Sequence, residues 1–324
     1  MNDEVSIITY HYVRDLDASR YPRIHGLPVR DFRRQIEYIQ DRYAVISGEH
    51  LIGALTGDAE LPPDAALLTF DDGYLDHYTS VFPVLDDAGL PACFFPPTRA
   101  VIDREVLDVN KIHYILASTP DVQDLEDTLF DLLAGWGDGE TASSRETYRQ
   151  AVTGDHRFDD PQVVLIKRLL QRELPDELRR RILDQLFDDY VDVSESVLAK
   201  ELYMTMDQVE TLQRHGMYIG SHGSRHAWMD RLEAAEQRAD VDRSLSFLEA
   251  VGTPTDEWIM CYPYGAHDAA LREYIREQGC VAGLTFTAGV ADIDRDDALK
   301  LPRLDTNDVP RTVDADAHPS SASG

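Results

Sequence analysis

Short apolar runs alternate with amphipathic stretches along the first hundred residues of the chain. Gly and Pro residues separate many of these segments, which is typical of strands and helices joined by turns. The predicted strands are 5–12, 44–47, 65–70 and 92–95, and the predicted helices are 31–42, 49–56 and 76–88. Nearly continuous apolar strands between helices predict an α/β fold with a covered parallel sheet, either open and doubly wound or closed into a barrel.

The pattern changes near residue 103, where charged helical stretches with few strand features begin. Alternation resumes after residue 202, where Thr205 and Gln208 have the spacing of a capping box that opens a helix. Further strands are predicted at 217–220, 257–261 and 281–286, with helices at 230–250 and 267–278. We therefore predict a β/α domain of residues 1–102 and 203–312, a helical insertion of residues 103–202, and a disordered tail of residues 313–324.

The chain is strongly acidic, with 60 acidic against 31 basic residues and a net charge of −29. Nucleic acid and anionic membrane surfaces are not expected as partners, because like charges repel. Lysine occurs at only four positions. An acid-rich, lysine-poor composition predicts a halophilic protein, since concentrated salt screens its self-repulsion. An acidic protein from an ordinary environment is the alternative.

The three cysteines, Cys93, Cys261 and Cys280, have no close-pair spacing. Their odd number favours reduced thiols and a cytoplasmic location. The first residues show no basic stretch followed by an apolar one, and no apolar run approaches the roughly 18 residues of a membrane span. We therefore expect neither a standard secretion signal nor a membrane-spanning helix, and the sequence does not define an oligomeric state.

Unusual polar residues follow three of the predicted strands directly. The three segments are TFDDG at 69–73, SHGSRH at 221–226 and CYPYG at 261–265. In parallel β/α architectures, chemistry gathers where the carboxyl ends of the strands meet the following loops. We therefore expect the two aspartates and the two histidines to lie close together.

These residue types favour a divalent metal site. Two histidines four residues apart can bind one ion, and one of the two aspartates can supply a third ligand, which leaves positions open for substrate. The other aspartate can then act as a general base. Taken alone, paired aspartates before glycine often mark only a solvated turn, and a lone histidine pair is often a helix surface.

Three motifs, TFDDGY at 69–74, SHGSRH at 221–226 and YPYG at 262–265, resemble in order the first three motifs of the polysaccharide deacetylase family, also called the NodB-homology domain or carbohydrate esterase family 4. The resemblance implies a deformed (β/α)7 barrel and a metal-dependent hydrolase in which a metal-bound water attacks an acetyl group. It implies that Asp71 is the catalytic base and that Asp72, His222 and His226 bind the metal. Tyr264 corresponds to the residue whose backbone N–H holds the oxyanion, and its ring either faces a sugar or packs in the turn.

The ligand set favours Zn²⁺, with Co²⁺, Ni²⁺ or Mn²⁺ as alternatives. Both imidazoles come from one segment, SHGSRH at 221–226. One divalent ion is therefore the expected cofactor.

The chain departs from the family pattern at two places. The third motif usually begins with an arginine that contacts the base, and Cys261 stands at that position. We predict that Arg303 fills this role from another loop, with a plain surface ion pair as the alternative. The last motif usually supplies a histidine as general acid, whereas the C-terminal part of this chain offers His318 in the predicted tail. Either Asp71 passes on its proton or His11, at the end of the first strand, serves as donor.

The predicted substrate is an N-acetylated carbohydrate, bound in part by His11 and Tyr264. The insertion and the expected cytoplasmic location favour a glycan precursor, such as a nucleotide- or lipid-linked sugar or an oligosaccharide. A polar cluster in LDVNKIH at 107–113 is either a lid that contacts substrate or a solvated helix face. Two other functions stay open, namely an amidohydrolase for a small cyclic imide or ureide and a non-catalytic carbohydrate-binding relative.

Overall fold

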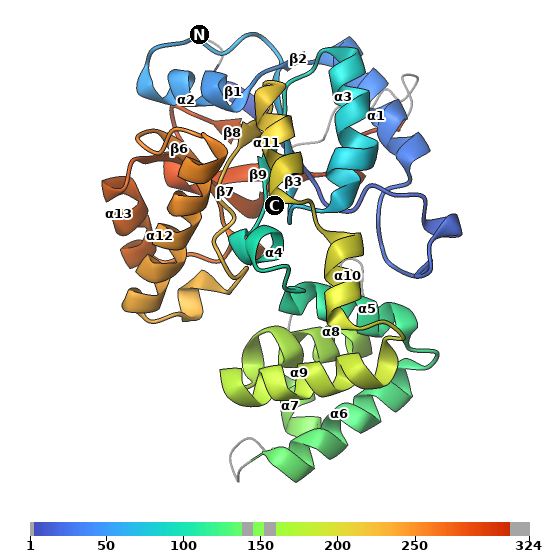
Figure 1. The fold of residues 1–324 in the computed structure, drawn as a ribbon. Coiled ribbons are helices and arrows are strands. Elements are labelled where there is room, and N and C mark those ends of the chain that lie inside the picture. Colours follow the sequence, from blue (N-terminus) through green and yellow to red (C-terminus); the bar gives the residue numbers. More distant parts are fainter. Residues whose placement is uncertain (1–2, 138–144, 152–159, 312–324) are drawn as a thin grey trace. The chain divides into compact units, whose positions relative to one another are not determined.

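The structure, a computed structural model, describes residues 3–137, 145–151 and 160–311. These residues form two compact units (Figure 1). The first unit comprises Met1–Asp15, Gly26–Glu105 and Ala199–Gly324, and the second comprises Leu16–His25 and Val106–Leu198. The predicted tail at 313–324 lies outside the described residues.

The first unit contains a nine-stranded sheet with mostly parallel pairing. The strands are β1 (Glu4–Tyr10), β2 (Ala44–Val45), β3 (Ala65–Asp71), β4 (Cys93–Phe95), β5 (Tyr218–Ile219), β6 (Trp258–Cys261), β7 (Cys280–Ala288), β8 (Ala291–Asp292) and β9 (Leu301–Asp305). Seven of them follow the order β5-β4-β3-β1-β9-β7-β6. A parallel bridge between Ser221 and Met260 joins the two ends of this order, so the sheet closes into a barrel.

Helices pack around the barrel, and one of them, Gly48–Thr56, contributes Leu51 and Ile52 to the cluster of strand side chains that contains Leu67. They are α1 (Val29–Arg42), α2 (Gly48–Thr56), α3 (Phe82–Ala88), α4 (Thr98–Ile102), α11 (Met206–Arg214), α12 (Ala234–Val251) and α13 (Ala269–Glu277), of which α12 and α13 pack against each other (Figure 1). Alternate residues of a strand face opposite sides of the sheet. Accordingly, Leu68 packs in the cluster that contains the helix residues Phe32 and Leu248, while Leu67 packs in a second cluster with side chains of the other strands.

Two predicted helices are interrupted in the structure. The predicted helix 76–88 consists of a π-helical turn at His77–Val81 followed by α3. Pro83 lies at the start of α3 and has no N–H to donate to the preceding turn, which accounts for the irregular segment. The predicted helix 230–250 begins only at Ala234, because a 3₁₀ turn at Met229–Arg231 precedes it. The predicted capping box of Thr205 and Gln208 is confirmed.

The second unit is helical. Its segment Val106–Leu198 contains α5 (Asp108–Ser118), α6 (Val122–Trp136), α7 (Arg145–Ala151), α8 (Pro161–Arg168) with a π-helical turn at Leu169–Glu173, α9 (Asp176–Tyr190) and the first residues of α10 (Glu195–Leu202), whose remainder belongs to the first unit. Helices α5 and α9 pack against each other. Among the described residues, no helix combines the length and apolar character that crossing a membrane requires. All three cysteines are free and buried.

Candidate active site

Strand β3 ends at Asp71, and the chain turns sharply at the next residue. Asp72 has a φ of 73°, in the left-handed region that disfavours most side chains. Gly73 follows with a φ of 67°, and a Cβ there would come within 2.7 Å of Pro96 Cβ, so glycine is required. Because of this turn, both carboxylates lie next to His222 instead of on opposite faces of a strand.

Asp72 meets the two predicted histidine ligands. Its Oδ1 atom lies 3.4 Å from His222 Nε2 and 3.2 Å from His226 Nε2. His222 Nδ1 lies 2.6 Å from the carbonyl oxygen of Cys261, so a proton on Nδ1 is donated to that carbonyl. This tautomer leaves the Nε2 lone pair of His222 directed toward Asp72, which is how second-sphere contacts orient metal-binding imidazoles.

These three residues fit a divalent cation. One donor atom from each of Asp72, His222 and His226 lies within 4.8 Å of the others, and all three residues are buried. Asp72 Oδ1 is buried and has no hydrogen-bond donor in the part of the chain that the structure describes. A buried carboxylate oxygen without a partner is costly. One carboxylate oxygen with two imidazole nitrogens is a donor set that zinc uses in proteins.

The charges around Asp72 favour its ionised form. Burial raises the pKa of Asp72, but the neighbouring imidazoles of His226 and His222 outweigh burial and hold the pKa well below its usual value of 3.8. The carboxylate is therefore charged at neutral pH.

A second group of potential ligands shares His222 with the first. It combines Asp71, His222 and Cys261. Arg303 Nη1 lies 2.8 Å from Asp71 Oδ2, and a fixed guanidinium charge beside the carboxylate disfavours a cation at the same place. The arrangement therefore favours the group that contains Asp72.

Asp71 is fully buried and is contacted by residues of several other strands. Arg303 Nη1 lies 2.8 Å from Oδ2 and 3.1 Å from Oδ1 of the carboxylate. Thr9 donates to Oδ2 at 3.3 Å, and the Cys261 thiol donates to Oδ1 at 3.4 Å. Burial raises the pKa of Asp71, but Arg303 and His222 outweigh it and lower the pKa below 3.8.

Arg303 lies inside the barrel. Its side chain is 1% exposed, and its Nε donates to the carbonyl oxygen of Thr285 at 2.9 Å. The alternative of a plain surface ion pair is therefore wrong, because β9 directs Arg303 inward beside Asp71. Asp305, the last residue of β9, caps the following turn by accepting from Asn307 N.

His11 and Tyr264 contact different residues of the site. His11 Nε2 is 3.9 Å from Asp71 Oδ2, and the side chain is 35% exposed. The ring of Tyr264 contacts the ring of His226 with centroids 4.6 Å apart. The role of the Tyr264 N–H as oxyanion donor stays a prediction.

Two aromatic residues next to the site were not predicted from the sequence. Trp228 stacks on Tyr264 with centroids 4.4 Å apart and an angle of 7° between the rings. Phe286 is 48% exposed, and its ring centroid lies 5.8 Å from that of His11. Phe286 is the last residue of the predicted strand 281–286. Its position at a strand end is the sequence feature that could have placed it near the site.

Left-handed backbone is concentrated at the site. Among the described non-glycine residues with positive φ are Asp72, His226 and Tyr264, with φ values of 73°, 52° and 57°. Each conformation costs of order 1–3 kcal/mol and persists only where the surrounding structure enforces it. Strained residues on all three predicted motifs are typical of a functional site.

His77 contacts the backbone just after the end of β1. Its Nε2 atom donates to the carbonyl oxygen of His11 at 2.9 Å, and its ring packs against Phe70 and Tyr74. The side chain is fully buried, and burial lowers the pKa of His77 from 6.5 to about 4.

This burial predicts a specific loss of stability in acid. Between pH 6.5 and 4 His77 binds a proton in the unfolded chain but stays neutral in the folded chain. The free energy of unfolding that His77 contributes therefore falls as the pH falls. Between pH 8 and pH 5 we expect the free energy of unfolding to fall about 2 kcal/mol more in the wild type than in His77→Gln, whose side chain does not titrate. Urea unfolding at both pH values measures the difference, and parallel pH dependences would contradict it.

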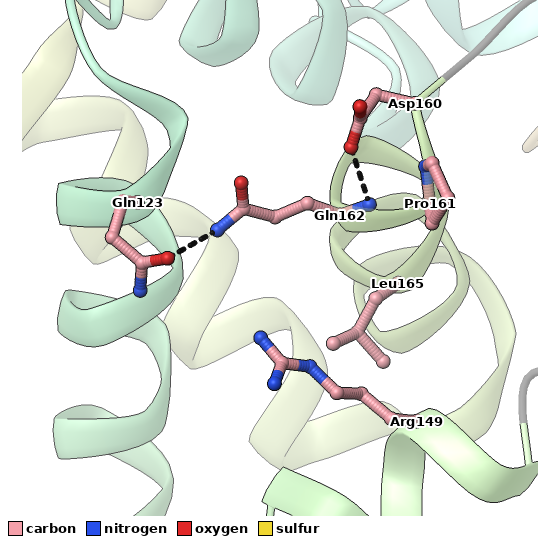
Figure 2. A pocket seen from close by; sticks show the side chains of 6 residues that line it. All are labelled: Gln123, Arg149, Asp160, Pro161, Gln162 and Leu165. Carbon is pink, nitrogen blue, oxygen red and sulfur yellow. Dashed lines mark hydrogen bonds between the residues drawn. The ribbon is translucent and has the colours of Figure 1, made fainter.

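The second unit contains none of the predicted site residues. A cavity of about 420 Å³ lies there, lined by Gln123, Arg149, Asp160, Pro161, Gln162 and Leu165; Figure 2 shows these side chains. The polar cluster of LDVNKIH serves this unit internally. Lys111 Nζ lies 2.7 Å from Asp184 and 3.0 Å from Glu195, Asp108 pairs with Arg179, and Asn110 is buried. This cluster is not a solvated face, because Asn110 and Lys111 are buried and the charges of Asp108 and Lys111 are paired within the unit, whereas its contact with substrate stays a prediction.

Comparison with known proteins defines the family. The profile of the family described as polysaccharide deacetylase matches residues 58–123 and 173–283, which is more than half of the chain. The matched ranges include Asp71, Asp72, His222, His226 and Tyr264. The chain therefore belongs to the polysaccharide deacetylase family, whose members include carbohydrate deacetylases.

A segment of 90 residues is 34% identical to the poly-beta-1,6-N-acetyl-D-glucosamine N-deacetylase of Escherichia coli strain K12 and covers 28% of this chain and 13% of that protein. The fold is similar to that of the Streptococcus pyogenes deacetylase PplD in complex with acetate, with a TM-score of 0.56 and 14% identity over 94% of this chain and 93% of the other. It is also similar to IcaB from Ammonifex degensii, with a TM-score of 0.53 and 19% identity over 95% of both chains. These similarities confirm the predicted (β/α)7 barrel of the NodB-homology type.

Proposed function

We propose that this protein is a metal-dependent hydrolase that removes the acetyl group from an N-acetylated sugar. The observation that carries the proposal is the convergence of Asp72, His222 and His226 beside an independently held Asp71. Family membership supports the reaction class, and the name of the Escherichia coli relative supports N-acetylglucosamine as the sugar unit.

The residues divide into a cation site and a proton-transfer site. When bound by Asp72, His222 and His226, a divalent cation, with Zn²⁺ favoured, supplies a Lewis acid that polarises an acetyl carbonyl and acidifies water. Asp71 is ionised at neutral pH and accepts the proton of the attacking water as the carbon–oxygen bond forms. Arg303 holds the Asp71 carboxylate in place, and both side chains are buried away from solvent.

The leaving amine requires a proton when the carbon–nitrogen bond breaks. His11 is the best placed donor, because Nε2 lies 3.9 Å from Asp71 Oδ2 on a partly exposed side chain. Strands β1 and β3 are paired in parallel with Tyr10 opposite Phe70, which sets His11 beside Asp71. The proton accepted by Asp71 can therefore return through His11 to the amine.

Aromatic rings on two sides of the site suit a carbohydrate. Trp228 stacks on Tyr264 near His226, and Phe286 is exposed near His11. Such rings bind the apolar faces of sugars while polar groups fix their orientation. A cytoplasmic location and a high-salt environment remain proposals, supported by the free cysteines and the net charge.

An acetate-release assay tests this function. The metal-loaded protein is incubated in concentrated salt with β-1,6-linked N-acetylglucosamine oligomers, with a nucleotide-linked N-acetylhexosamine and, in a separate assay of ring opening, with a cyclic imide, which releases no acetate. We expect acetate from at least one sugar, loss of more than nine tenths of the activity on chelation, and recovery when Zn²⁺ or Co²⁺ is returned. Turnover of the imide alone would favour the amidohydrolase alternative, and activity that survives chelation would exclude the metal-dependent reaction.

A further inference from the structure

We propose that Tyr74 is a positioning residue that holds one oxygen of Asp72 so that the other oxygen alone faces the cation site. This inference rests on the proposed function, since it concerns the same site. The Tyr74 hydroxyl donates to Asp72 Oδ2 at 2.6 Å. The opposite oxygen, Oδ1, is the one that lies near His222 Nε2 and His226 Nε2.

The two oxygens of a carboxylate are chemically equivalent until the protein distinguishes them. At Asp72 the geometry of a strand does not distinguish the two oxygens, because the residue follows β3 and has a left-handed backbone conformation. The hydrogen bond from Tyr74 occupies Oδ2, whereas Oδ1 has no donor among the described residues. Asp72 is therefore arranged to bind through a single oxygen, which leaves more coordination positions for substrate and water.

Tyr74 is itself fixed in place. Its side chain is 0% exposed, and its ring stacks on Tyr12 with centroids 4.0 Å apart. An antiparallel bridge joins the backbones of Tyr74 and Tyr203, and their rings lie parallel at 6.3 Å. The edge of His77 also contacts the ring of Tyr74. The hydroxyl cannot leave Asp72 unless these packed rings move, so it can impose an orientation on the carboxylate.

The test is the affinity for a divalent cation, measured without catalysis. Equilibrium dialysis of Zn²⁺ against a competing chelator gives the dissociation constant for each variant. We expect Tyr74→Phe to bind Zn²⁺ about 10–100-fold more weakly than the wild type, which is the usual effect of losing a second-sphere contact. Tyr262→Phe is the matched control, because it removes a buried hydroxyl that donates to the Leu299 carbonyl at 3.1 Å and does not contact Asp72. We expect the control to bind Zn²⁺ as the wild type does.

The outcomes separate this inference from the proposed function. Equal Zn²⁺ affinity in Tyr74→Phe and the wild type, with weak binding by Asp72→Asn, would overturn the role of Tyr74 and leave the cation site standing. Equal affinity in Asp72→Asn and the wild type would overturn the cation site itself. If Tyr74→Phe does not fold by circular dichroism, p-fluorophenylalanine at position 74 keeps the ring and nearly fills the space of the hydroxyl but offers no donor to Asp72. An affinity within twofold of the wild type in that variant would overturn the inference, and a weaker affinity would support it.

Discussion

Asp71→Asn is expected to lower the turnover number for acetate release about 10³-fold, within the 10²–10⁴-fold that a general base contributes. Asparagine keeps the shape of the side chain but cannot accept the proton of the attacking water. Asp71 is not among the three residues assigned to the cation, so Zn²⁺ affinity should stay within a few-fold of the wild type. Stopped-time acetate assays at saturating substrate measure the first effect, and equilibrium dialysis measures the second.

The variant needs a check on folding, because Asp71→Asn leaves the Arg303 charge buried without its carboxylate. Removing one partner of a buried ion pair costs about 3–5 kcal/mol. Circular dichroism and the Zn²⁺ affinity show whether the site is intact before activity is compared. If a folded, Zn²⁺-binding Asp71→Asn retained more than a tenth of the wild-type turnover, Asp71 would not be the base.

Arg303→Ala is expected to move the acidic side of the pH–rate profile to higher pH. Burial alone raises the pKa of Asp71, and Arg303 is the first of the charges that lower it. Without the guanidinium, Asp71 takes up a proton at a higher pH and loses its function as base over a wider acidic range. The pH dependence of kcat/KM measures the shift. The free energy of unfolding of the same variant should be about 3–5 kcal/mol lower than that of the wild type, since the buried carboxylate loses its partner.

A second substitution provides the matched control. Cys261 Sγ lies 3.4 Å from Asp71 Oδ1, and the family usually has arginine at this position, so an arginine there can reach the same carboxylate. We expect Cys261→Arg in the Arg303→Ala background to return the acidic side of the profile toward the wild-type pH. An unchanged profile in Arg303→Ala would show that Arg303 does not control the protonation of Asp71.

The barrel could be predicted because its strands are apolar and regularly spaced. All seven residues of β3 are buried, and five of the six that precede Asp71 are apolar. The last strands were not predicted, since β8 has only two residues and β9 carries Pro302 and Arg303 among its five. Such short polar strands depend on their neighbours in the sheet, and periodicity does not reveal them.

The residues of the cation site were predictable for a different reason. Asp72, His222 and His226 follow apolar strands directly, and parallel strands bring their carboxyl ends together. Tyr74, Trp228 and Phe286 look in the sequence like ordinary aromatic core residues. Their contacts with Asp72, Tyr264 and His11 arise from packing between segments far apart in the chain, which local patterns do not encode.

The arrangement of the cation site can be tested by anomalous scattering at the zinc absorption edge from crystals grown with Zn²⁺. We expect one strong peak bound by Asp72 Oδ1, His222 Nε2 and His226 Nε2, with Asp71 paired to Arg303 and outside the coordination sphere. A peak bound instead by Asp71 and Cys261, or no peak between these strand ends, would contradict it.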